Sequence, residues 1–453
     1  MRYNLRFILK MALPIALSYL AVGMMNVVDT LIVGNYNTAD LAYIGIANTV
    51  FAVLYCVPTA MLQGILIHTA QFFGGKKFKS CGRVYYCSVR YAVILSLVFM
   101  FVGLGGKQIF EMLGQDEDVC VNAAKLLAIY ALSIPAVLYY ANANYFLQAI
   151  KRPFVGTAGF VLGNLLNLMI NPVLTYGWLG APEMGAAGCA LTTLIIRTAM
   201  ALYISGYIRM MKKNKRVCKY FGFDEKIKNW WQQGKPTRRI GYGLALIVAA
   251  TNGSFSMVNV FAGWLGIEAL AAYTIVAQVN VFVFMIFFAL SQATTIVVAN
   301  TFGKQQFDKL KFATLSGYAV YTFAAVLLLG GLAIFDKQIY GLFSNDEKII
   351  TEVTSLILFV IIDLFIDTLP LNIEASLRGI NDIKYLTLSQ IVAFLFARIG
   401  ACYLLAFVCG LKLAGLILGL AGGGICSAIL NGPRLLIEYK KAARKNLSQK
   451  AFN

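Results

Sequence analysis

Long hydrophobic runs separated by short polar segments recur along the whole chain. A run of about 20 apolar residues can cross a hydrocarbon core of about 30 Å as a helix, whereas a β-barrel would show short alternating segments. The pattern therefore predicts an all-α integral membrane protein with twelve spans. The expected spans are 8–33, 42–68, 84–104, 122–148, 155–175, 186–208, 240–263, 268–300, 314–335, 350–376, 384–407 and 411–432.

The composition supports membrane helices and excludes an ordinary soluble domain. Of the 453 residues, 59% are hydrophobic and only 13% are charged, against about 25% charged residues in a soluble globular domain. The opening segment "MRYNLRFILK" is basic, and the apolar run behind it continues to about Val33. That run is longer than the h-region of a signal peptide, about 7–15 residues, so an uncleaved first span is predicted.

Candidate residues for enzyme or metal chemistry are sparse. The nine cysteines lie mostly in apolar runs without C-x-x-C spacing, which argues against a disulfide framework or a zinc site. His68 is the single histidine, and neither HExxH nor GxSxG occurs. The sequence therefore argues against an intramembrane enzyme, and neither a catalytic residue nor a cofactor is expected.

Basic residues gather on one side of the predicted membrane. When the connections are assigned alternately to two sides, five of the 39 Lys and Arg residues fall on one side. Two more, Arg197 and Arg398, fall inside spans, which leaves 32 on the side that holds both termini. This positive-inside bias predicts that both termini face the cytoplasm. It also explains the net charge of +19 without a nucleic-acid partner.

The two halves of the sequence match each other at an offset of 229 residues. Gln63 then meets Gln292, and "FGGKKF" at 73–78 meets "FGKQQF" at 302–307. Because six spans separate the copies, both halves have the same orientation, which predicts a parallel repeat of two six-helix lobes. Two such lobes suit alternating access to a central cavity.

The repeat also suggests how the chain divides into domains. We expect an N-terminal lobe at 1–210, a cytoplasmic basic linker at 211–239, a C-terminal lobe at 240–432 and a basic cytoplasmic tail at 433–453. Two readings of the linker stay open. It is either a plain interdomain connection or an amphipathic segment that its two adjacent tryptophans anchor at the membrane surface.

Four of the acidic residues inside predicted spans are candidates for a functional role, because a charge costs about 2.5–3.5 kcal/mol at the bilayer centre. Asp29 lies in span one, and Asp363, Asp367 and Glu374 lie in span ten. Asp363 and Asp367 are four residues apart and share a helix face. Both cannot comfortably ionise, which suits the binding of a proton or a cation. Glu374 precedes Arg378 by four residues, so a local ion pair explains it.

Other polar side chains in the spans offer partners for these acids. Asn167 and Asn171 lie one turn apart in "GNLLNLMINP", 163–172. They either line a cavity or join neighbouring helices by hydrogen bonds. Arg197 and Arg398 require partners inside the membrane, and the sequence does not identify them.

Several stretches in both halves resemble one family of transporters. Together they cover both lobes, and their order and spacing are specific. The chain resembles a multidrug and toxic compound extrusion (MATE) transporter, in its NorM-like bacterial branch. The stretches are "LP" at 13–14, "VDTLIVG" at 28–34, "LAYIGIANTVF" at 41–51, "NPVLTYGWLGAPEMGAAGCALTT" at 171–193, "LAAYTIVAQVNVFVFM" at 270–285 and "SLRGIND" at 376–382.

The resemblance implies the fold and the activity of the MATE and MOP flippase superfamily. The expected activity is export of cationic or amphipathic organic compounds across the bacterial inner (plasma) membrane in exchange for H⁺ or Na⁺. The expected partners are these compounds and the surrounding lipid bilayer, with no other cofactor. The expected assembly is a monomer. Two alternatives stay open: a lipid-linked precursor flippase of the same superfamily, which usually has a more cationic cavity, and the less favoured intramembrane enzyme.

The resemblance also assigns roles to residues. It implies that cation coupling, including Na⁺ binding, involves Asp29 with Asn167 and Asn171, with a sixth-span threonine near Thr193. It puts the family's first-helix proline, where the helix of some members bends, at Pro14.

The second lobe carries further assignments and one departure from the family. An acid that couples cations corresponds to Asp367, and we expect Asp29, Asp367 and Gln278 to contact the substrate. Many NorM-like members have a glutamate in span seven, but this sequence has Thr251 there. Asp363, one turn from Asp367, is expected to compensate.

Overall fold

The computed structural model describes residues 2–225, 227–342 and 347–451. Within these ranges the chain is helical and no strand occurs. Ten helices in the described ranges are long and apolar enough to cross a membrane, and the number rises to twelve if each of two bent helix pairs is counted as one span. The predicted all-α fold with twelve spans is thus confirmed in this part of the chain.

Both bent pairs fall on predicted spans. The span expected at 122–148 consists of Glu117–Leu132 and Ile134–Ala149, bent by 40°, and the span expected at 350–376 consists of Glu347–Ser355 and Ile357–Gly379, bent by 55°. The first bend coincides with Pro135 in the opening turn of the second helix. Proline removes a backbone donor and clashes with the preceding turn, so the helix changes direction there.

The chain forms two compact units, Leu17–Ala245 and Met1–Ala16 together with Leu246–Asn453. We call them the N-terminal unit and the C-terminal unit. The divisions fall inside two long helices, α1 (Arg2–Gly34) and α12 (Lys235–Trp264). Each of these helices therefore contributes residues to both units.

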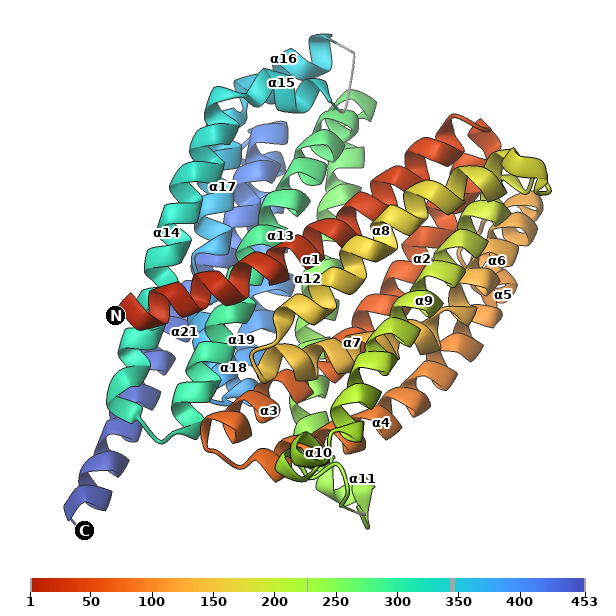
Figure 1. The fold of residues 1–453 in the computed structure, drawn as a ribbon. Helices are drawn as coiled ribbons and strands as arrows, with labels where there is room; N and C mark the ends of the chain where they lie inside the picture. The colour runs from red at the N-terminus through yellow and green to blue at the C-terminus, as the bar shows by residue number, and fades with distance from the viewer. Residues whose placement is uncertain (1, 226, 343–346, 452–453) are drawn as a thin grey trace. The chain divides into compact units, whose positions relative to one another are not determined.

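The N-terminal unit contains the second half of α1, the start of α12 and all the elements between them. Figure 1 shows α8 running beside α1, and α8 also packs on α9. Its other elements are α2 (Thr38–Leu62), α3 (Gly64–Gly74), α4 (Phe78–Leu104), α5 (Gly106–Met112), α6 (Glu117–Leu132), α7 (Ile134–Ala149), α8 (Pro153–Tyr176), η1 (Trp178–Gly180), α9 (Gly185–Lys213), α10 (Lys215–Phe221) and α11 (Trp230–Gln233).

The C-terminal unit contains the rest of α12 and all the elements that follow it. Helices α13, α14 and α17 pack side by side, and α21 packs on α17 and α20. Its other elements are α13 (Ile267–Gly303), η2 (Phe307–Lys309), α14 (Leu310–Ile334), α15 (Asp336–Gly341), α16 (Glu347–Ser355), α17 (Ile357–Thr368), α18 (Leu371–Gly379), α19 (Ile383–Ile391), η3 (Val392–Arg398), α20 (Ile399–Tyr403), η4 (Leu404–Val408) and α21 (Lys412–Ala451).

Two turns with the same left-handed φ and matching hydrogen bonds support the internal repeat. Lys76 and Gln305, 229 residues apart, both adopt a left-handed backbone with φ of 57°. The amide of Lys77 donates to Phe72 at 2.9 Å, and the amide of Gln306 donates to Thr301 at 3.3 Å, again at an offset of 229. Neither left-handed residue is glycine, so the repeated turn geometry outweighs the local preference for glycine.

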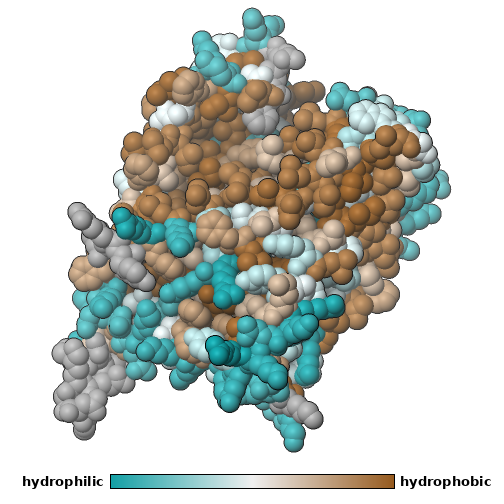
Figure 2. Space-filling view, in the orientation of Figure 1, coloured by the Kyte–Doolittle hydropathy of each residue, from teal (hydrophilic) through white to brown (hydrophobic). Residues whose placement is uncertain are grey.

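The outer faces of the helices are suited to lipid rather than water. Figure 2 shows hydrophobic side chains covering the flanks of the helices and hydrophilic ones gathering near their ends. In the N-terminal unit Leu168 is 59% exposed and Met169 is 70% exposed, and in the C-terminal unit Phe323 and Val326 are 65% and 69% exposed. Contiguous apolar surface of this kind marks a membrane or partner contact.

The start of α12 packs backbone to backbone against α2 and α3. A Cβ atom on Gly64 would lie 2.2 Å from the carbonyl oxygen of Thr237, and one on Gly241 would lie 1.9 Å from that of Met61. His68 Nδ1 and Thr237 Oγ1 are hydrogen-bonded at 2.9 Å across the same contact. The contact packs residues 237–241 tightly against α2 and α3.

Gly241→Ala is therefore expected to destabilise the protein by about 1–3 kcal/mol, because the new methyl group must push two backbones apart. Gly263→Ala on the same helix is the matched control, since no heavy atom lies within 4 Å of its Cβ position. It is expected to be neutral or to stabilise by up to about 1 kcal/mol. Thermal unfolding followed by size-exclusion chromatography compares them. Equal stability of the two variants would contradict the close contact.

Candidate functional site

A buried carboxylate with three neutral hydrogen-bond donors lies in the N-terminal unit. Asp29 on α1 is 5% exposed. Its Oδ1 accepts hydrogen bonds from Asn167 Nδ2 at 2.9 Å and Asn171 Nδ2 at 2.7 Å, both on α8. Its Oδ2 accepts from Thr193 Oγ1 on α9 at 3.3 Å. The structure thus brings together four residues of spans one, five and six that were assigned to cation coupling from the sequence.

The two asparagines differ in what their carbonyl oxygens do. Asn171 Oδ1 accepts a hydrogen bond from Thr175 Oγ1 at 2.9 Å, so its amide is held in one orientation. Asn167 Oδ1 is buried and has no hydrogen-bond partner. Rotating this amide would present an acceptor to Asp29, which suits a protonated carboxyl or a small cation. The site can therefore serve an ionised or a neutralised Asp29.

The arginine of span six, Arg197, is partly buried and lies on the same helix as Thr193. Arg197 Nη1 donates to Ser133 Oγ at 2.9 Å, and its guanidinium carbon lies 4.5 Å from the ring centroid of Phe51. Its charge attracts Asp29 without a direct hydrogen bond. The direct partners of Asp29 are neutral, so its charge remains available to a bound cation.

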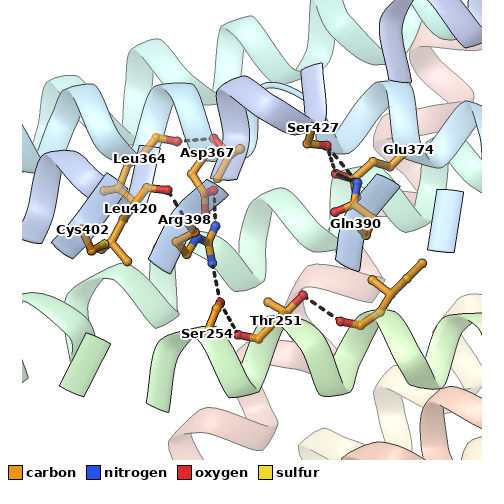
Figure 3. A network of polar contacts seen from close by, with 12 residues as sticks. Thr251, Ser254, Leu364, Asp367, Glu374, Gln390, Arg398, Cys402, Leu420 and Ser427 are labelled. Carbon is orange, nitrogen blue, oxygen red and sulfur yellow. Dashed lines mark hydrogen bonds and ion pairs between the residues drawn. The ribbon is translucent and has the colours of Figure 1, made fainter. Parts of the chain in front are cut away.

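The C-terminal unit contains a buried ion pair instead. Arg398 Nη2 donates to Asp367 Oδ1, and the arginine side chain is fully buried. Arg398 also donates through Nε to the carbonyl of Leu420 at 3.3 Å and through Nη1 to Ser254 Oγ at 3.4 Å (Figure 3). The partner of Arg398, which the sequence left open, is thus Asp367 on α17.

Two features of the backbone make room for this pair. Arg398 is the last residue of the π-helical segment η3, and π-helical turns often occur at functional sites. On α21, a Cβ atom at Gly423 would lie 2.8 Å from Arg398 Nε, and one at Gly424 would lie 2.6 Å from Asp367 Cα. Only a glycine at each position lets α21 approach so closely.

The extra acid of span ten lies next to the pair. Asp363 is 3% exposed, and its Oδ1 has no hydrogen-bond partner. Electrostatic interaction links it to both Asp367 and Arg398. The cluster therefore holds two carboxylates and one guanidinium, and one buried acceptor remains for a proton or a cation.

Thr251 and Gln278, the other candidate residues of the second lobe, lie outside the cluster of Asp363, Asp367 and Arg398. Thr251 Oγ1 donates to the carbonyl of Ile247 at 2.9 Å, and its own carbonyl accepts from Ser254 Oγ at 2.7 Å, which connects it to Arg398 (Figure 3). Gln278 is exposed on α13 and forms no hydrogen bond with the described residues. Its expected contact with substrate remains a prediction.

Glu374 is held by neutral donors. Its Oε1 accepts hydrogen bonds from Gln390 Nε2 and Ser427 Oγ, both at 3.0 Å (Figure 3). Arg378, expected to pair with it, attracts it electrostatically but donates through Nη2 to Ser291 Oγ at 2.7 Å. Glu374 thus joins α18 to α19 and α21, a role beyond the local helix pair expected from its spacing.

Pro14 lies in the interior of α1, two residues before the division between the two units. Proline removes one backbone donor from the helix ladder, so this is the point at which α1 is easiest to bend.

Sequence reasoning missed several uncharged members of these networks. Ser254, Gln390 and Ser427 hold the buried charges of the C-terminal unit, and Ser133 holds Arg197. Hydroxyl and amide side chains are common in membrane helices, where most join neighbouring helices. These four residues differ from the other polar residues of the helices because they lie next to a buried charge. A single sequence does not give that position.

The fold and the two sites define a multi-pass membrane protein built from two related halves, each with acidic groups buried among its spans. The chain belongs to the MatE family, which matches residues 14–173 and 244–404. This confirms the resemblance stated from the motifs.

Named relatives and solved structures agree with this membership. The chain is 24% identical over 436 residues to "Probable multidrug resistance protein NorM" of Caulobacter vibrioides, covering 96% of this chain and 90% of that protein. It is 25% identical over 440 residues to "Multidrug resistance protein NorM" of Aliivibrio fischeri, covering 95% and 94%. The structure entitled "Outward-facing conformation of a multidrug resistance MATE family transporter of the MOP superfamily" superposes with a TM-score of 0.87, at 17% identity and 97% coverage of each chain.

Proposed function

We propose that the protein is a secondary active multidrug exporter that exchanges H⁺ or Na⁺ for cationic or amphipathic organic compounds by alternating access. Membership of the MatE family and the names of its NorM relatives support the activity. The main support for the coupling mechanism is the environment of Asp29. This carboxylate is buried, and the side chains that donate hydrogen bonds to it are all neutral.

In this mechanism Asp29 binds the coupling cation with Asn167 and Asn171, and Thr193 orients the carboxylate. Neutralising a buried carboxylate removes a desolvation cost of several kcal/mol. The cation shifts the equilibrium between outward-open and inward-open forms because the two forms bind it with different affinity. Export follows when the cation and a cationic substrate compete for the same charge.

The C-terminal unit supplies a second acidic cluster to the proposed mechanism. Asp367 is neutralised by Arg398, so the cluster takes up a cation through Asp363, whose Oδ1 has no partner. Asp29, Asp367 and Gln278 contact the substrate, and Pro14 allows α1 to bend. The protein acts as a monomer in the bacterial inner membrane with both termini in the cytoplasm.

Dye uptake into proteoliposomes tests the function. An ethidium-like cationic dye is expected to accumulate against its gradient under an imposed proton or sodium gradient, and the effective gradient identifies the coupling ion. A lipid-linked precursor flippase would move a labelled polyprenyl-phosphate lipid and leave the dye unmoved. No dye transport under either gradient would overturn the proposal.

A further inference from the structure

An open groove of about 620 Å³ lies at the start of α12 in the N-terminal unit. It is lined by Trp231, Gln232, Lys235, Arg238, Arg239 and Tyr242. Three of the six residues are cations, and the aromatic side chains of Trp231 and Tyr242 are 48% and 43% exposed. The groove therefore joins a positively charged region to an exposed apolar one.

Among the described residues, no ion-pair partner balances the positive charge of the groove. Helix N-termini carry a partial positive charge, which disfavours cations there, yet Lys235, Arg238 and Arg239 all lie within the first five residues of α12. The first turn contains no acidic residue. Within the described ranges, the ion pairs closer than 4.0 Å include none of these three residues. An anion at the groove would balance both the side chains and the helix end.

Packing contacts hold Arg238 in place on one side of the groove. Arg238 is 6% exposed, its guanidinium carbon lies 3.7 Å from the ring centroid of Trp231, and its Nη2 donates to the carbonyl of Trp231. The close backbone contacts at Gly64 and Gly241 fix the helix turn that carries Arg238 and Arg239. A preorganised site spends little free energy on ordering its side chains when it binds.

The depth of the groove indicates what kind of anion fits. Helix α12 is a candidate membrane span that begins at Lys235. Tyr242 lies seven residues further along, about 10 Å deeper at 1.5 Å per residue. Exposed Trp and Tyr side chains at such a level are typical of the boundary between headgroups and acyl chains. The ligand therefore combines an anionic group at Lys235 and Arg239 with an apolar part at Tyr242.

We propose that this groove binds an anionic phospholipid. Its phosphate lies between Lys235 and Arg239, where Arg238 adds positive charge, and its acyl chain covers Trp231 and Tyr242. Basic pockets at the ends of membrane helices recognise lipid phosphate in this way. The proposal does not depend on the transported substrate.

Binding of phosphatidylglycerol to the purified protein in detergent tests the proposal, with native mass spectrometry as the readout. The double variant Lys235→Gln/Arg239→Gln is expected to bind the lipid about tenfold more weakly than the wild type. The matched control is Lys215→Gln/Arg216→Gln on α10, which removes two exposed cations of the same unit and should keep wild-type affinity. Arg239→Lys, which keeps the charge, should retain most of the binding.

Further arms separate the lipid from other ligands. Phosphatidylcholine is expected to bind at least about tenfold more weakly than phosphatidylglycerol, and inorganic phosphate is expected neither to displace the lipid nor to stabilise the protein. Displacement by inorganic phosphate would make the groove a phosphate site, and equal losses in both double variants would make the binding nonspecific. Either result overturns the proposal. If the groove double variant fails to fold, Arg239→Gln alone should show about threefold weaker binding.

Discussion

Asp29→Asn is expected to reduce dye efflux to the level of vesicles without protein while the protein stays folded. Asparagine has the shape of aspartate but no charge, so the coupling cation loses its carboxylate. The three donors from Asn167, Asn171 and Thr193 would face one carbonyl oxygen and one competing donor. Because the site loses a buried charge instead of leaving one unpaired, we expect little loss of stability.

Dye accumulation in proteoliposomes under an imposed ion gradient reports efflux activity and measures this effect, and size-exclusion chromatography checks the fold. Asp116→Asn is the matched control, because it removes an exposed carboxylate of the same unit and should leave efflux unchanged. Asn167→Ala should give a partial loss, since two donors to Asp29 remain. Gradient-driven efflux by Asp29→Asn at the wild-type rate would falsify the role of this carboxylate in coupling.

The scaffold could be predicted from the sequence because length and periodicity determine it. Hydrophobic runs of membrane thickness have few structural options, since backbone groups must be satisfied within each segment. The sequence repeat extends to the backbone conformation of single residues, because the matched residues Lys76 and Gln305 are both left-handed. The bends inside two spans were not predicted, although Pro135 marks one of them.

The two polar sites are not repeated between the halves of the chain, unlike the helices that hold them. At the offset of 229 residues, Asp29 corresponds to Val258 and Asp367 corresponds to Leu138, and both of these apolar residues are fully buried. The two halves thus kept one scaffold and acquired separate chemistry on different helices. Internal similarity therefore predicted the helices but could not predict either site.

The site of the N-terminal unit was the more predictable one. Asn167 and Asn171 share a face because they are four residues apart, and the resemblance to transporters named their partner. The site of the C-terminal unit could be recognised only from the three-dimensional structure. Arg398 reaches Asp367 from a π-helical turn, and the glycines at 423 and 424 let α21 approach. None of these features has a periodic signal in the sequence.

Arg398→Met is expected to destabilise the protein by about 3–5 kcal/mol, the range found when one partner of a buried ion pair is removed. The substitution leaves Asp367 and Asp363 buried together without their common cation. Asp367→Asn should cost less, because Asp363 remains one turn away to balance Arg398. The double variant Asp367→Asn/Arg398→Met should recover much of the loss, since it removes both charges of the pair.

Unfolding by denaturant in detergent micelles measures the four proteins of this double-mutant cycle. Lys107→Met is the control: Lys107 pairs with Glu111 at 3.7 Å, both side chains are 52% exposed, and exposed pairs contribute about 0–1 kcal/mol. The informative quantity is the difference between the double variant and the sum of the single ones. Two results would contradict this account: additive losses in the cycle, or an Arg398→Met protein as stable as the wild type. Either would show that Arg398 does not neutralise the charge of Asp367. In that case Asp367 would join Asp29 as a carboxylate whose charge is available to the coupling cation.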